Sequence, residues 1–177
     1  PAPATPRACI GLPLCLNMYE LLPFWHTLFT RLGFEVVVSP FSSRSLYQSG
    51  QATIPSDTAC FPAKLSHGHI HWLCEQGVDA IFYPCMSYNL DEHLGDNHYN
   101  CPVVAYYPEV LEGNCPELNG TRFLYDYFNL ERRKDFYKKF QQSLDKYFPG
   151  LDKKAVREAI DAAYDEYHRH MQQLRDK

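Results

Sequence analysis

Residues 54–73 carry the densest collection of ligand-type side chains in the sequence. The stretch IPSDTACFPAKLSHGHIHWL holds Cys60, Lys64 and the three histidines His67, His69 and His71. Cysteine and imidazole are common zinc ligands, and cysteine thiolates hold iron–sulfur clusters. The competing hypothesis is an ordinary loop and helix, in which these polar groups cap and solvate the backbone and Lys64 is a solvated helix residue.

A zinc site would use the helix predicted over residues 63–76. His67, His71 and Cys74 are spaced i, i+4 and i+7, which puts them on one helical face. The spacing matches no standard zinc finger or ribbon. We therefore favour a structural role: His67 packs against the sheet with its ring hydrogen-bonded, His69 and His71 lie on the solvated side, and no zinc is bound. A nucleophile and base pair made by Cys60 with a histidine is also disfavoured, since no oxyanion hole is recognisable.

The cysteines indicate the compartment. There are seven, at positions 9, 15, 60, 74, 85, 101 and 115. An odd number without a CxxC pair fits a reducing compartment better than a disulfide framework, and we expect a cytoplasmic protein. Cys9 and Cys74 are interpreted as small buried hydrophobic residues, whereas the other five flank strand-like segments, where ligands are usually found.

The elements that must position these residues follow from the hydrophobic pattern. Short apolar runs predict four strands, RACIGLPL, FEVVV, VDAIFYP and PVVAYYP. Helices are predicted between them, at 17–33, over SRSLYQSG and at 63–76. Continuous apolar strands that alternate with helices are typical of a parallel sheet covered on both faces. The predicted fold is a three-layer αβα domain with a mostly parallel, roughly four-stranded sheet.

Local signals refine this prediction. Asn17 and Glu20 have the spacing of a capping box at the start of the first helix, and Gly33 and Gly77 are expected to end helices in left-handed conformation. We expect the side chains of six apolar residues to be buried: Leu28, Leu32, Val36, Val37, Ile81 and Phe82.

Charge is spread unevenly and suggests a boundary near residue 130. Residues 1–130 contain five Lys and Arg against twelve Asp and Glu, whereas residues 131–177 contain twelve against nine. The second part predicts two amphipathic helices, whose apolar faces carry Phe136, Phe140, Leu144 and Phe148 and then Val156, Ile160, Ala163 and Tyr167. We therefore divide the chain into an α/β candidate cluster-binding domain at 1–130 and a helical extension at 131–177.

Ligands of open α/β sheets bind at the carboxyl ends of the strands. Cys85 directly follows the third strand, and Cys60 leads into the third helix, whose N-terminal dipole favours a thiolate. Cys101 is harder to place, because a parallel fourth strand at 102–108 would put it at the opposite edge. Either the chain loops back before this strand, the strand starts later, or Cys101 is not a ligand and Cys115, which follows the strand, is the better substitute.

Several functions are excluded or disfavoured. A formal net charge of −4 does not suggest a general nucleic-acid binder, and no apolar run is long enough to span a bilayer. Neither a P-loop, nor a GxGxxG after a strand, nor a GxSxG motif is present, so we expect no ATP hydrolysis by this chain itself and no complete catalytic machinery. Because the sequence begins with Pro1, we expect it to be a piece of a longer chain.

Four stretches match one known family in order. They are LNMYELLPFWHTLFTRLGFEVVVS, IPSDTACFPAKLSHGHI, GVDAIFYPC and DNHYNCPVVAYYPEV. Over about residues 8–112 the sequence resembles the uncharacterised domain of proteins related to 2-hydroxyacyl-CoA (2-hydroxyglutaryl-CoA) dehydratase activases, which is distantly similar to dehydratase and double-cubane iron–sulfur subunits. The last ~50 residues match only as generic helices.

This resemblance implies an oxygen-sensitive iron–sulfur cluster, either [4Fe-4S] or part of a double cubane, which an aerobic sample can lack. It assigns Cys60, Cys85 and Cys101 as cluster ligands, thiolates being the ligands that such iron requires. It further implies electron transfer in anaerobic metabolism, with ATP-binding activase modules and dehydratase-like domains of the same or a partner chain as partners. The alternative is a metal-free docking domain that holds these parts together.

Overall fold

A computed structural model describes residues 6–93 and 95–177 of the chain. It contains one sheet of four parallel strands in the order β2-β1-β3-β4. The strands are β1 (Cys9–Leu12), β2 (Glu35–Val38), β3 (Ala80–Phe82) and β4 (Arg122–Leu124). The α-helices are α1 (Met18–Arg31), α2 (Arg44–Gly50), α3 (Phe61–Glu75), α4 (Pro102–Asn114), α5 (Arg133–Tyr147) and α6 (Lys153–Arg175); the short 3-10 helices are η1 (Gln51–Thr53) and η2 (Pro116–Gly120).

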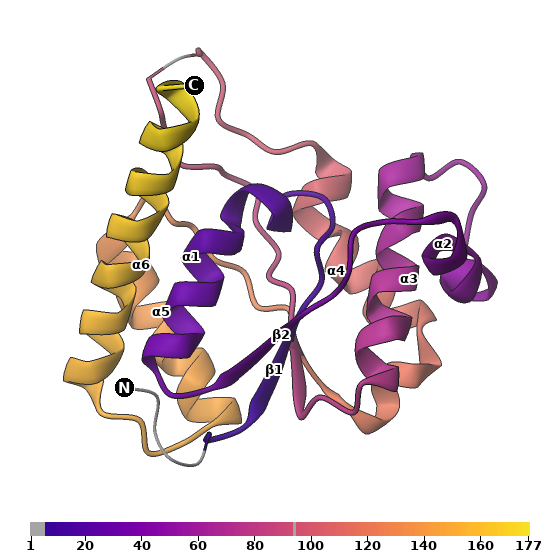
Figure 1. The fold of residues 1–177 in the computed structure, drawn as a ribbon, viewed down its shortest axis with the longest axis horizontal. Helices are drawn as coiled ribbons and strands as arrows, with labels where there is room; N and C mark the ends of the chain where they lie inside the picture. The colour runs from indigo at the N-terminus through magenta and orange to yellow at the C-terminus, as the bar shows by residue number, and fades with distance from the viewer. Residues whose placement is uncertain (1–5, 94) are drawn as a thin grey trace.

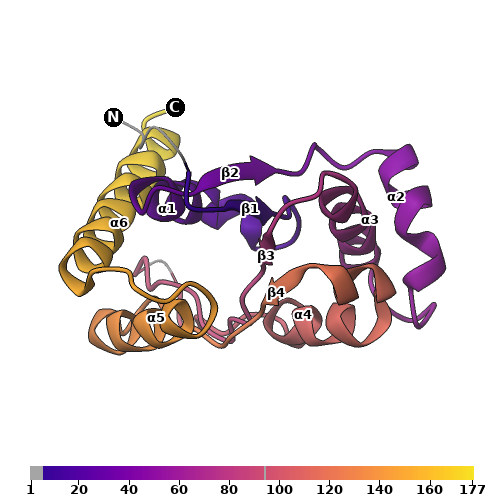
Figure 2. The ribbon, with the colours of Figure 1, turned by 90° about the horizontal axis from the view of Figure 1, so that it is seen from below.

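The helices form a layer on each face of the sheet, as Figures 1 and 2 show. Helices α1, α5 and α6 cover one face, and α3 and α4 cover the other, with α2 packed outside α3. The predicted three-layer αβα fold with a four-stranded parallel sheet is confirmed. The two predicted C-terminal helices are present as α5 and α6, and they pack on the α1 side of the sheet.

Aromatic rings fill the core on this side. Phe82 of β3 packs against Trp25 and Phe29 of α1, with ring centroids 4.7 and 4.9 Å away, and against Phe140 of α5 at 6.4 Å. Tyr164 of α6 reaches Phe24 of α1 at 4.9 Å. Burial of large aromatic side chains is a dominant contribution to folding, so the helices at 133–175 share the core of the sheet.

The fourth strand differs from its prediction. PVVAYYP begins helix α4, and β4 is the short segment Arg122–Leu124. Pro102 occupies the first turn, where its missing N–H is not needed, and the helix also continues through Pro108. A short apolar run bounded by prolines fits a buried helix as well as a buried strand, which is why the pattern was misassigned.

Two local predictions are corrected. Asn17 is the N-cap of α1, but its side chain makes no capping hydrogen bond, so the capping box with Glu20 does not form. Val36 and Val37 are only partly buried, because β2 is an edge strand of the sheet. The left-handed conformations of Gly33 (φ 83°) and Gly77 (φ 68°) are confirmed.

Helices α2 and α3 approach one another backbone to backbone. Gly68 of α3 lies against the carbonyl group of Leu46 in α2, and Gly50 lies against the backbone of His67 and Gly68. A Cβ atom built on Gly68 would be 2.7 Å from the Leu46 carbonyl carbon. Glycine at both positions is therefore what permits this close crossing.

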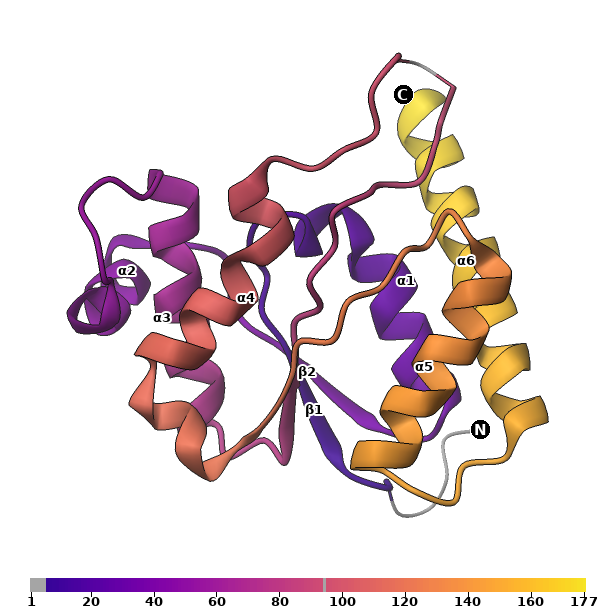
Figure 3. The same cartoon turned by 180° about the vertical axis from the view of Figure 1, so that it is seen from behind.

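Three elements meet at the carboxyl end of the sheet. The long connection after β3 runs past the C-terminal end of α6, as Figure 3 shows, and the Arg175–Glu92 ion pair at 3.1 Å joins the two. The backbone N–H of Asp91 donates to Glu131 at 2.9 Å, which ties the same connection to the start of α5. In the part of the chain that the structure describes, no helix is both long and apolar enough to cross a membrane.

Candidate functional site at the carboxyl edge

The chain leaves neighbouring strands β1 and β3 toward opposite faces. After β1 it enters α1 on one face, and after β3 it enters α4 on the other (Figure 2). In open α/β sheets the crevice at such a switch point is the usual place for a ligand. The described segments that border it here are residues 13–17 after β1 and the first residues after β3, 83–87.

Two of the predicted cysteines occupy equivalent positions beside this crevice. Cys60 is the N-cap of α3 and Cys101 is the N-cap of α4. Both residues are exposed, and neither side chain makes a capping hydrogen bond. The N-terminal ends of the two helices lie next to each other at the carboxyl end of the sheet (Figures 1 and 3). The unpaired N–H groups and dipole of a first helical turn favour an anionic sulfur.

The placement of Cys101 follows from the corrected secondary structure. Because the segment after it is a helix that runs back along the sheet, Cys101 lies at the carboxyl edge. Cys115 lies at the other end of α4, roughly 20 Å along the helix axis. There its sulfur is 3.6 Å from both Thr53 Oγ1 and His67 Nδ1. Cys115 was expected at the carboxyl edge because a strand was predicted at 102–108; helix α4 occupies this segment, so Cys115 does not lie at that edge.

Cys85 lies in the sheet layer, three residues after the end of β3. Its backbone continues the pairing of β3 with β4: its N–H donates to Asp126 at 3.1 Å, and its carbonyl accepts from Phe128 at 3.1 Å. The side chain is buried. Burial, with the nearby charge of Glu109 as a second cause, raises the pKa of the Cys85 thiol to about 11. In the free protein this sulfur is therefore a neutral thiol.

A second buried thiol and two polar groups lie at the end of β1. Burial raises the pKa of Cys15 to about 12, and its thiol lies beside the hydroxyl of Tyr83. That hydroxyl has no partner at ordinary hydrogen-bonding distance among the described residues, and the same is true of both polar atoms of the Asn17 side chain. Buried polar atoms without a hydrogen-bond partner are uncommon, and each lowers the stability of a fold by roughly 1–3 kcal/mol.

The thiols at this edge do not form a site for a single ion. Within residues 6–93 and 95–177, no three His, Cys, Asp or Glu side chains come close enough to hold one metal ion. In a [4Fe-4S] cluster each cysteine binds a different iron, so its ligands do not share an ion. The donors at the carboxyl edge are soft sulfur atoms, and this chemistry fits iron–sulfur ligation rather than magnesium or calcium.

The histidines of α3 have structural partners. His67 is buried, with Nδ1 2.8 Å from Thr53 and Nε2 2.9 Å from Tyr107, so its ring is hydrogen-bonded as predicted. These partners belong to η1 and α4 and not to the sheet, against which the ring was predicted to pack. His69 was predicted to be solvated, but it is buried between Ser39 and Ser42 at 2.7 and 2.9 Å. The chain before α2 covers it, and sequence periodicity gives no sign of this. Burial lowers the pKa of each imidazole to about 4.

His71 is half-buried. Its ring nitrogens lie 3.2 Å from Glu117 and 3.4 Å from Glu75. These partners come from η2 and from the end of α3, and they are different from the partners of His67.

Exposed aromatic residues lie close in the chain to the two exposed cysteines. Phe61 follows Cys60 and is 59% exposed, and Tyr99, two residues before Cys101, is 67% exposed. The carboxyl-edge rim, as we call it, is made of six exposed aromatic residues in the loops and first helical turns at this edge: Tyr19, Phe41, Phe61, Tyr99, Tyr106 and Tyr127. The sequence gives only a crowding of aromatic residues before position 130 and does not indicate that they gather at one edge.

Comparison with known proteins supplies the family. No curated protein and no solved structure matches this chain. The family model of the CoA enzyme activase uncharacterised domain (DUF2229) matches residues 9–177, which include α5 and α6 as well as the segment around the cysteines. The protein therefore belongs to the CoA enzyme activase uncharacterised domain family.

Proposed function

We propose that this domain is an iron–sulfur electron-transfer module and that Cys60, Cys85 and Cys101 hold the cluster. The observation that carries the proposal is the common location of the three thiols. Two cap neighbouring helices at the carboxyl edge, and the third follows the strand beside the switch point. Cysteines that serve only as apolar filler have no reason to gather at the ligand-binding edge of a parallel sheet.

The residues around these thiols have definable roles. The first-turn N–H groups of α3 and α4 would stabilise the negative charge on Cys60 and Cys101. Cys85 requires loss of its proton on binding, which iron can compensate because a coordinated thiol is deprotonated. A bound cluster would supply one-electron redox chemistry. Burial of Cys85 under Tyr127 would limit access of water to that ligand.

The partners that we propose for this module are ATP-binding activase modules and dehydratase-like domains. The support is membership in the CoA enzyme activase family, together with the aromatic rim beside the proposed ligands. Exposed aromatic clusters are typical of protein interfaces. An electron carrier needs such a surface, because the partner must approach its redox centre closely.

Anaerobic reconstitution tests the proposal. The domain is incubated with ferrous iron and sulfide without oxygen, and bound iron, acid-labile sulfide and visible absorption are measured. Cys60→Ser should abolish the brown colour and iron binding but leave the far-UV circular dichroism unchanged. Cys74→Ser, on the same helix but half-buried, is the matched control and should bind as the wild type does. Wild-type protein that takes up no iron, even together with its neighbouring domains, would show the cluster proposal to be wrong.

The second candidate function is a metal-free docking domain, and the carboxyl-edge rim favours it. In that case the aromatic residues bind the activase or dehydratase-like part, and the cysteines are incidental. Phe41→Ser with Tyr99→Ser should then weaken association with those domains, measured by sedimentation, in protein that contains no iron. If this double variant associates as the wild type does, the rim is not the docking surface.

A further inference from the structure

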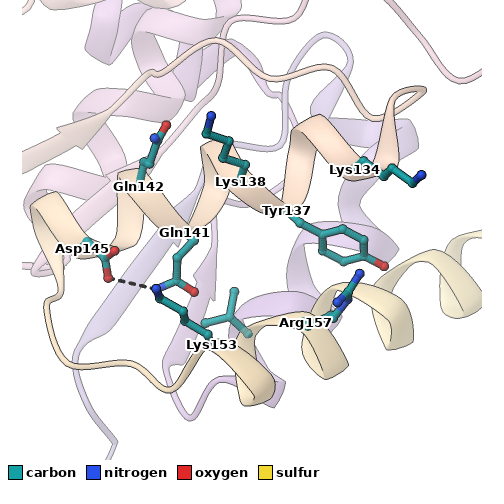
Figure 4. A pocket seen from close by; sticks show the side chains of 9 residues that line it. Lys134, Tyr137, Lys138, Gln141, Gln142, Asp145, Lys153 and Arg157 are labelled. Carbon is teal, nitrogen blue, oxygen red and sulfur yellow. Dashed lines mark hydrogen bonds between the residues drawn. The ribbon is translucent and has the colours of Figure 1, made fainter.

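A basic groove runs between α5 and α6, away from the cysteines. It has a volume of about 460 Å³ and is lined by residues of both helices: Lys134, Tyr137, Lys138, Gln141, Gln142, Asp145, Lys153, Val156 and Arg157. Figure 4 shows Lys134 and Lys138 along the α5 side and Lys153 and Arg157 along the α6 side. We use the name basic groove for the cavity between these four cations. Its volume is within the range of small-molecule and peptide-binding clefts.

The four cations have no salt bridges among the described residues, although other charged residues of these helices do. The one carboxylate that lines the groove, Asp145, accepts a hydrogen bond from Gln141 at 2.9 Å (Figure 4). The groove therefore has an excess of positive charge, in a chain whose formal net charge is −4.

This arrangement is unfavourable for the isolated helices. Lys134 and Lys138 are an i, i+4 pair of like charges on α5, and Lys153 and Arg157 are another on α6, and each such pair destabilises a helix by about 0.2–0.5 kcal/mol. Lys153 is also the first residue of α6, where the helix dipole disfavours a cation. Arg157 has a structural partner in the ring of Tyr137, whereas the three lysines have none among the described residues, and an anionic occupant of the groove would remove the repulsion.

The floor of the groove has apolar side chains that can contact the apolar part of a ligand. Tyr137 is half-buried and Val156 is buried. The guanidinium carbon of Arg157 lies 4.8 Å from the centroid of the Tyr137 ring, and the Tyr137 hydroxyl donates a hydrogen bond to Asp161. The four cations are spread along the two helices and do not converge on one point, and Lys138 extends toward the side of α5 that faces away from α6 (Figure 4). This spread fits an elongated occupant better than a single phosphate group.

We infer that the basic groove binds an acidic amphipathic segment of a partner protein. Apolar side chains of that segment would lie on Tyr137 and Val156, and its carboxylates would pair with the lysines and the arginine on either side. Charge complementarity is the basis of this assignment. The inference is independent of the cluster, because the groove contains none of the cysteines and no residue of the carboxyl-edge rim.

A peptide titration tests the inference. The probe is a fluorescein-labelled 18-residue amphipathic peptide, with leucines on one face and glutamates on both flanks, and anisotropy is measured against the 177-residue chain. We expect saturable binding that weakens as salt is added, since exposed ion pairs are screened. A peptide with glutamine in place of every glutamate should bind at least about tenfold more weakly, equivalent to about 1.4 kcal/mol.

A pair of double variants isolates the groove from general charge effects. Lys138→Glu with Lys153→Glu should weaken binding by about tenfold or more. The Lys153 change puts a carboxylate at a helix N-terminus, which favours folding. Lys139→Glu with Lys154→Glu makes the same change in net charge one residue further along each helix, outside the groove, and should leave binding within about twofold of the wild type.

Three results would overturn the inference. The first is no saturable binding of the glutamate peptide up to about 1 mM. The second is equal weakening by the control variant, which would indicate nonspecific attraction. The third is displacement of the peptide from the groove by sodium tripolyphosphate with an apparent dissociation constant well below that of the peptide, which would indicate a phosphate site in its place.

Discussion

Replacing Gly68 with alanine should destabilise the protein strongly, although alanine is the better helix former. The new Cβ would lie 2.7 Å from the carbonyl carbon of Leu46, and ordinary contact begins at 3.4 Å. The neighbour is backbone and cannot rotate away, so α2 must move away from α3 by more than half an ångström. This movement would expose Leu46, which is buried in the wild type. It would also disturb the hydrogen bonds that His67 and His69 make with the segments flanking α2.

The magnitude follows from these contributions. Overpacking against a rigid neighbour costs up to about 3 kcal/mol, and one weakened hydrogen bond adds about 1 kcal/mol. The higher helix propensity of alanine offsets about 1 kcal/mol. We therefore expect a loss of about 3 kcal/mol in the free energy of unfolding. For a chain of this size that corresponds to a fall in Tm of roughly 6–12 °C.

Urea and thermal unfolding followed by circular dichroism measure this loss. The matched control is Gly113→Ala in α4, where a Cβ would meet nothing within 4 Å. It should leave the protein as stable as the wild type or up to about 1 kcal/mol more stable. If Gly68→Ala and Gly113→Ala have the same effect, α2 does not lie against α3 as described, and the argument from glycine contact is refuted.

Three further expectations concern buried and exposed groups. The pKa values of His67 and His69 are lowered to about 4 in the folded protein, so the unfolded chain binds more protons than the folded one between about pH 6.5 and 4. The free energy of unfolding should therefore be constant above pH 6.5 and fall below it by at most about 1.4 kcal/mol per pH unit for each histidine. Urea midpoints that do not change between about pH 7.5 and 5 would contradict this. Tyr83→Phe removes a buried hydroxyl without a hydrogen-bond partner among the described residues and should leave the free energy of unfolding unchanged or raise it by up to about 1 kcal/mol; a loss of 2 kcal/mol or more in urea unfolding would reveal a partner for that hydroxyl. Iodoacetamide should modify the exposed thiols of Cys60 and Cys101 before any buried thiol in the iron-free native protein, as followed by peptide mass spectrometry, and earlier modification of a buried thiol would show local opening of the fold.

The sequence predicts the layers and most of the helices because their patterns are strong. Helices α5 and α6 have long amphipathic faces, and the glycines after α1 and α3 mark where those helices end. Helix α4 and strand β4 were not predicted. The apolar run after Pro102 is ambiguous between helix and strand, and β4 is only three residues long, which is too short for a periodic pattern.

The candidate site was only partly predictable for a related reason. Cys60 and Cys85 could be placed from the strand and helix that they adjoin. Cys101 could not, because its position depended on the misassigned segment that follows it. The burial of His69, the lone hydroxyl of Tyr83 and the basic groove all arise from contacts between residues far apart in the sequence. Local periodicity contains no information about such contacts.

The position of two candidate ligands at helix N-caps has a consequence for how the family can evolve. Cys60 and Cys101 lie at the N-caps of α3 and α4, outside the aromatic core that holds the helices on the sheet. Unlike a zinc finger, whose folding depends on its metal, this domain should therefore keep its structure when an edge cysteine is replaced. We therefore expect a lineage to discard the chemistry of the edge by single substitutions while retaining the scaffold, and to insert any cluster only after the chain has folded.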